Sequence, residues 1–173
     1  MHALIKGLLV SGLMISFAAS AAPATRSEDN APRWRSGPPL ALSFATGPAF
    51  QRLTGWTFSS ALMAKPLDDQ PLFVGGEVGL GFFSGQTVLS LLPTALYGFD
   101  VGWANAHPYL GLAAGPALSF ESSRDNRILF EFLVRPGMQF DVAKNMFLTL
   151  EPKLGWLGSD FLFLPQASVV LPL

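Results

Sequence analysis

From residue 40 onward, apolar side chains occupy every second position in short segments that are separated by turn-forming residues. Over 147–156 the even positions hold Leu, Leu, Pro, Leu and Trp, whereas the odd positions hold Phe, Thr, Glu, Lys and Gly. The segment 128–141 alternates in the same way. Successive side chains of a β-strand point to opposite faces, which a helix cannot reproduce. The pattern therefore predicts strands that are apolar on one face.

Two uncharged stretches, 78–99 and 101–120, are also long enough to cross a bilayer as helices. Glycine and proline interrupt both stretches, although membrane helices tolerate some of each. The two-residue period favours strands over helices for this part of the chain.

The same period marks eight segments along the chain: 40–51, 56–66, 72–83, 88–101, 108–120, 128–141, 147–157 and 161–172. Each is near the roughly 9–11 residues that a tilted membrane strand needs. An even number of such segments is typical of outer-membrane barrels, and closure leaves no unpaired sheet edge in lipid. We therefore predict an all-β fold, a closed antiparallel up-and-down eight-stranded transmembrane β-barrel.

The N-terminus predicts export. A weakly basic start, an apolar stretch over 7–18 and the small residues of 19–21 match a cleavable signal peptide, interpreted as residues 1–21. The alternative is an uncleaved membrane anchor, for which the apolar stretch is short. The polar, proline-rich segment 22–39 is predicted to be a flexible leader, and the barrel to occupy 40–173.

Composition narrows the function classes. Only 13% of the 173 residues are charged, and the formal net charge is −1, so we expect no nucleic-acid partner. The chain has no cysteine, which excludes disulfides, thiol catalysis and thiolate metal sites.

The odd or even position of a residue along a strand, here called its parity, decides which face of the predicted sheet its side chain occupies. Leu, Val and Phe point outward, whereas the inward positions are rich in Gly, Ala and Ser, as a narrow barrel requires. Four apolar residues are exceptions that parity turns inward: Leu92, Leu96, Leu162 and Leu164. Aromatic residues near the segment ends, Tyr109 and Phe147 among them, are interpreted as two belts at the membrane interfaces.

The charged residues that point inward are the one candidate functional site in the sequence. Parity turns six of them into the lumen: Lys65, Glu77, Glu131, Arg135, Glu151 and Lys153. Buried charges persist when they are paired, so the first interpretation is an ion-paired core. The alternative is a gate, in which exchange of ion partners opens a water path.

Catalytic motifs are sparse. After the predicted cleavage site His107 is the only histidine, and we expect it to be a solvated turn residue. The sequence predicts no catalytic, metal or cofactor residues.

Six prolines fall within predicted strands, all at outward parity: Pro48, Pro93, Pro116, Pro136, Pro152 and Pro165. A proline removes one hydrogen bond from a sheet ladder. The first interpretation is local bulging of the barrel wall, and the alternative is a weakened seam that a lipid could enter sideways.

Together the signal peptide, the strand 108–115, the tight turn 141–145 and the alternating final strand resemble the small eight-stranded outer-membrane β-barrels of Gram-negative bacteria, of the OmpA-transmembrane-domain, OmpX and OmpW kind. The resemblance implies a location in the outer membrane, with its lipids and the barrel-assembly machinery as partners. Family members often end in an aromatic residue, whereas this chain ends in Leu173. Lipid A deacylases and palmitoyltransferases share this barrel size, but no histidine-serine site of their kind is visible.

The sequence thus predicts a non-enzymatic, porin-like cell-envelope barrel with a structural, adhesive or narrow solute-passage role. The polar 121–127 loop is the candidate contact for a surface ligand. One alternative is a lipid-modifying outer-membrane enzyme. Another is a soluble periplasmic barrel that binds an apolar ligand, which requires apolar residues inside and polar residues outside.

Overall fold

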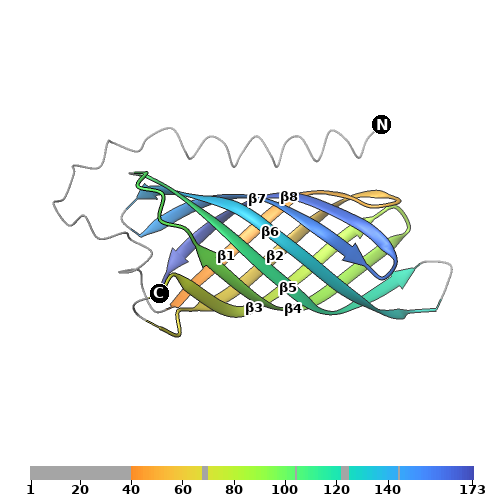
Figure 1. Cartoon of the computed structure of the whole chain (residues 1–173). Helices are drawn as coiled ribbons and strands as arrows, with labels where there is room; N and C mark the ends of the chain where they lie inside the picture. Colours follow the sequence, from red (N-terminus) through yellow and green to blue (C-terminus); the bar gives the residue numbers. More distant parts are fainter. Residues whose placement is uncertain (1–39, 68–69, 104, 122–124, 144) are drawn as a thin grey trace.

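The computed structural model describes residues 40–173 except 68–69, 104, 122–124 and 144. Eight strands form one closed barrel, each antiparallel to the next (Figure 1). They are β1 (Leu40–Phe50), β2 (Thr54–Ala64), β3 (Leu72–Phe83), β4 (Gln86–Gly98), β5 (Ala106–Glu121), β6 (Arg127–Ala143), β7 (Met146–Leu157) and β8 (Asp160–Pro172).

The predicted fold class is confirmed, and each predicted segment overlaps one strand. The predicted signal peptide (1–21) and leader (22–39) lie outside the described residues. Across the described part of the chain, no helix has the length and apolar character needed to span a membrane.

The two ends of the barrel differ in their connections. The start of β1 and the end of β8 lie together at one end, here called the terminus end (Figure 1). That end also carries the connections 65–71, 99–105 and 144–145. Two of these connections are seven residues long. The opposite loop end carries the connections 51–53, 84–85, 122–126 and 158–159, none longer than five residues. Outer-membrane barrels usually carry their longer loops on the end away from the termini, so this chain inverts that asymmetry.

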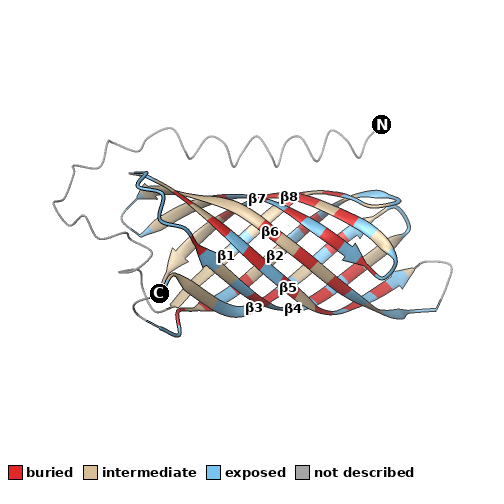
Figure 2. Ribbon diagram, in the orientation of Figure 1, coloured by how far each residue is buried: buried red, intermediate tan, exposed pale blue. Residues whose placement is uncertain are grey.

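Buried and exposed residues alternate along the strands (Figure 2). Large apolar side chains lie on the outer face, including Phe44, Leu112 and Leu150, each about half exposed. The belt interpretation was wrong for two aromatic residues. Tyr109 is buried in the lumen, and Phe147 lines a cavity there.

Apolar side chains fill most of the loop-end half of the lumen, beside buried polar residues such as Ser119 and Glu131. Leu92, Leu133, Leu157 and Leu162 are each at most 2% exposed and belong to one core cluster, which also contains Leu164. The predicted inward direction of Leu92, Leu162 and Leu164 is therefore confirmed. Eight strands leave an interior that side chains must fill, so these leucines form the plug of a narrow barrel.

Bulging at the prolines is contradicted by the strand register. Pairing on both sides of each in-strand proline follows one constant register. The described ladders shift register between Asp141 and Ala143, near the terminus end of β6. The prolines therefore interrupt the ladder without inserting a residue.

Close strand contact at Gly155 gives a first testable expectation. A Cβ added there would lie 1.8 Å from the Phe132 carbonyl oxygen, which is backbone and cannot rotate away. We expect Gly155→Ala to lower the free energy of unfolding by about 1–3 kcal/mol, the range for overpacking. Gly76→Ala is the matched control, because a Cβ at Gly76 meets nothing within 4 Å. Urea titrations of both variants in lipid vesicles test the difference, and equal midpoints would contradict it.

Candidate functional site

The centre of the lumen contains an ion-pair cluster of four side chains: Glu77 from β3, Arg135 from β6, and Glu151 and Lys153 from β7. Arg135 Nη1 lies 2.9 Å from Glu77 Oε2, and Lys153 Nζ lies 2.5 Å from Glu77 Oε1. Arg135 also binds Glu151 through two nitrogens, with Nε on Oε1 and Nη2 on Oε2 at 3.2 Å. The structure thus brings together four of the six predicted residues.

Because the cluster is buried, breaking its ion pairs would change the free energy of unfolding. Lys153 is 1% exposed, and Glu77, Arg135 and Glu151 are each at most 6% exposed. Two carboxylates and two cations balance in charge. A buried charge that loses its partner costs about 3–5 kcal/mol, whereas the intact pair is not necessarily better than an apolar replacement. The cluster therefore fixes one arrangement of β3, β6 and β7 around the lumen.

Two hydroxyl groups complete the cluster. The Tyr109 hydroxyl donates to Glu151 Oε2 at 2.9 Å, and Arg135 Nη1 donates to Thr94 Oγ1 at 3.3 Å. Neither residue was predicted from the sequence to lie in the site. Their signal was available, because each is a polar residue at inward parity in a largely apolar strand.

The other two predicted residues lie outside the four-residue cluster. Glu131 is buried and accepts a hydrogen bond from the Ser90 hydroxyl. Lys65 is buried too, but it follows β2 toward the terminus end, four positions beyond Ala61, the register partner of Glu77. All six are therefore buried.

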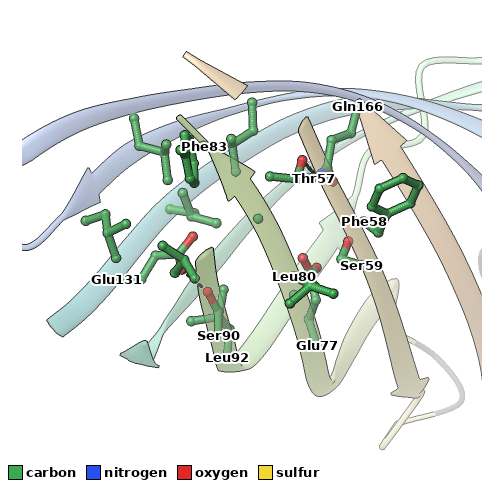
Figure 3. Close-up of a pocket in the computed structure, with 17 residues that line it drawn as sticks. Thr57, Phe58, Ser59, Glu77, Leu80, Phe83, Ser90, Leu92, Glu131 and Gln166 are labelled. Atoms are coloured by element: carbon green, nitrogen blue, oxygen red, sulfur yellow. Dashed lines mark hydrogen bonds between the residues drawn. The ribbon is translucent and has the colours of Figure 1, made fainter. Parts of the chain in front are cut away.

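A cavity lies on each side of the cluster. The terminus-side cavity measures about 90 Å³, and Glu77, Arg135 and Glu151 contribute to its wall. The loop-side cavity measures about 30 Å³, room for roughly two water molecules. Figure 3 shows the loop-side cavity with Ser90 and Glu131 on one side and Thr57 and Gln166 on the other.

His107 differs from its predicted environment. It lies within β5, is 8% exposed, and its Nε2 is 3.5 Å from Asp141 Oδ1. The expectation of a solvated turn histidine is therefore wrong. Among the described residues, no group of three or more His, Cys, Asp or Glu side chains is arranged to hold a metal ion.

Taken together, the cluster and the leucine plug close the lumen in this conformation. The site contains buried, mutually paired charges between two small cavities. Such an arrangement can seal a barrel, and it can open a path only if the ion partners separate.

The fold is that of the small eight-stranded outer-membrane β-barrels. The chain is similar in structure to neisserial surface protein A (NspA), with a TM-score of 0.63 at 14% identity over 78% of this chain and 96% of that one. It is also similar to the N-terminal barrel domain of Pseudomonas aeruginosa OprF, with a TM-score of 0.55 at 10% identity, covering 78% and 98%. A third similar structure is the outer membrane enzyme PagL, with a TM-score of 0.50 at 16% identity, covering 77% and 99%.

No protein-family model matches the chain, and no curated protein matches it in sequence. Identities of 10–16% establish the common fold alone. One of these proteins is an enzyme, so the fold does not decide the function.

Proposed function

We propose that the protein is a non-enzymatic outer-membrane barrel with a structural role in the cell envelope, closed to solutes in its resting state. The observation that carries this proposal is the doubly blocked lumen. The Glu77–Arg135–Glu151–Lys153 cluster spans its centre, and the leucine plug fills the loop-end half.

The outer surface supports a membrane location over the soluble alternative. A soluble barrel with an apolar ligand needs a polar exterior, whereas this exterior exposes Phe130 at 61% and Leu91 at 58%. Exposed apolar side chains on nearly every strand fit a lipid surround. Outer-membrane lipids and the assembly machinery are the partners that this role implies.

The loop end supports a structural role over an adhesive one. Its connections are two to five residues long, which leaves little surface beyond the strands for a protein partner. The predicted contact loop 121–127 lies partly outside the described residues.

Narrow solute passage is the second candidate, and the two cavities favour it. They approach the ion-pair cluster from opposite sides. Separation of Arg135 from Glu77 and Glu151 would connect the two cavities, which would then form the first part of a path. The leucine plug would still have to move.

Conductance in a planar lipid bilayer separates these candidates. We expect the refolded full chain to insert without producing steady current at neutral pH. Trypsin protection of the inserted protein provides the control for insertion. Steady unitary currents from the unmodified protein would contradict the closed structural barrel and support solute passage.

A further inference from the structure

Four of the strand prolines form one row across β6, β7, β8 and β1. Pro152 faces Pro165 directly across β7 and β8. Between β8 and β1 the register pairs Thr46 with Ala167 and Phe50 with Phe163, which sets Pro48 opposite Pro165. Between β6 and β7 the same reasoning sets Pro136 opposite Pro152.

Facing prolines remove both hydrogen bonds that such a pair would exchange, because neither has an N–H group. Regular pairing accordingly stops after Thr46–Ala167 and resumes at Phe50–Phe163. At about 3.3 Å per residue, this interruption spans about 13 Å of the β8–β1 seam. The β6–β7 seam has an interruption of the same length, between Val134–Leu154 and Met138–Leu150.

The interrupted seams differ in what else holds them together. The β6–β7 seam is bridged from inside by the ion pair between Arg135 and Glu151. At the β4–β5 interruption, Pro93 and Pro116 are staggered by two positions, so each faces a residue that has an N–H group.

The β8–β1 seam has an uncharged support. Gln166 of β8 donates a hydrogen bond to the Thr57 hydroxyl of β2, which donates in turn to the Gly47 carbonyl oxygen of β1. β1 contains no ionisable side chain, and the one in β8 is Asp160 at its loop end, so no ion pair between these two strands can cross the interruption. The stacked rings of Phe50 and Phe163, 6.0 Å apart, lie at one edge of it. Neutral hydrogen bonds therefore bridge this interruption, whereas an ion pair bridges the one between β6 and β7.

The lumen behind this seam contains apolar side chains beside the buried polar side chain of Gln166. Ala49 and Leu164 flank the interruption and belong to the buried core cluster, together with Leu162. Opening a wall onto water would expose that cluster at about 25 cal/mol per Å². Opening it onto lipid exposes the leucines to hydrocarbon that is as apolar as they are, so that cost is absent.

We propose that the β8–β1 seam opens sideways at Pro48 and Pro165 and admits an acyl chain of a membrane lipid into the loop-end half of the lumen. The proposal rests on the membrane location proposed above. In this proposal the plug leucines move aside. The path of the acyl chain starts at the adjacent 30 Å³ cavity, which is lined by Leu162 and Leu164 and also by the polar side chains of Glu131 and Gln166.

Photocrosslinking in vesicles tests the proposal. The full chain is refolded into phosphatidylcholine vesicles that contain a phosphatidylcholine with a diazirine in the middle of one acyl chain. After irradiation, mass spectrometry locates the modified residues. We expect modification of outward residues such as Leu150, and also of the inward residues Leu92 and Leu162.

A disulfide across the seam provides the decisive variant. A49C/L164C places two cysteines at positions that the register sets opposite each other, in a chain with no cysteine of its own. We expect oxidation to lower labelling of Leu92 and Leu162 at least about fivefold, and reduction to restore it, because the bond fixes the strands together. The control lock S43C/A61C joins the continuously paired strands β1 and β2 outside the core cluster and should leave labelling unchanged.

Proline replacement gives an independent readout. P48A/P165A restores both missing N–H groups at the seam and should reduce inward labelling, whereas P136A/P152A restores them at the bridged β6–β7 seam and should not. Outward labelling without inward labelling, or inward labelling that the A49C/L164C lock leaves unchanged, overturns the lateral opening. Absence of outward labelling as well would instead overturn the membrane location.

Discussion

Replacing Arg135 by methionine is expected to lower the free energy of unfolding by about 3–5 kcal/mol, the cost of breaking a buried pair by removing one partner. Methionine fills much of the same volume, so the loss reports the charge rather than a cavity. Arg135 contacts both Glu77 and Glu151, and its removal leaves two buried carboxylates with Lys153 as the remaining cation of the four-residue cluster. Urea titration in lipid vesicles, followed by tryptophan fluorescence, measures the change.

Arg127→Met is the matched control for this variant. Arg127 begins β6 and is exposed, so the same substitution on the same strand should change stability by about 0.5 kcal/mol or less. Similar losses in the two variants would contradict a paired, buried role for Arg135. A second comparison uses R135M/E151Q, which removes one cation and one carboxylate, keeps the Glu77–Lys153 pair, and should recover part of the loss.

Parity was sufficient to predict the fold and the direction of every charged lumen residue. A strand turns alternate residues to one face regardless of its neighbours, so Glu131, Arg135, Glu151 and Lys153 could be placed inside from spacing alone. The inward leucines followed from the same rule. In a barrel too narrow for a pore, they had to fill space.

Parity does not determine which inward residues meet. Contacts across a lumen depend on the relative height of strands that are not neighbours, which follows from the stagger accumulated around the barrel. Glu77 on β3 therefore meets Arg135 and Lys153 from the far wall, although no spacing in the sequence connects them. His107 was missed for another reason. Proline after it indicated a turn, whereas the structure extends β5 through Pro108.

The proline row shows the same limit. Outward parity of the six prolines was evident from the sequence, but their facing positions depend on register between strands. A bulge and an interruption of the backbone hydrogen bonds between two strands look the same in the sequence, since both appear as a proline in an alternating strand. Only the constant register on both sides distinguishes them, because a bulge would shift it by one residue.

A charge placed on the outer wall should show whether that wall faces lipid. Leu150 lies near the middle of β7 and is 50% exposed on the apolar face. If the barrel spans a bilayer, Leu150→Arg should cost about 2–4 kcal/mol in vesicles, the value for arginine near the midplane of a barrel wall. Titration of the free energy of unfolding against urea measures it.

Leu173→Arg is the control that makes this result specific. Leu173 is 61% exposed and follows β8 at the terminus end, where a membrane-spanning barrel meets its interface. An arginine there should cost about 0–1 kcal/mol. A wall that faced water would make the two substitutions equivalent, each within about 0.5 kcal/mol of the original protein. Equal small effects would therefore contradict the membrane location, whereas a large effect confined to Leu150 requires a wall surrounded by hydrocarbon.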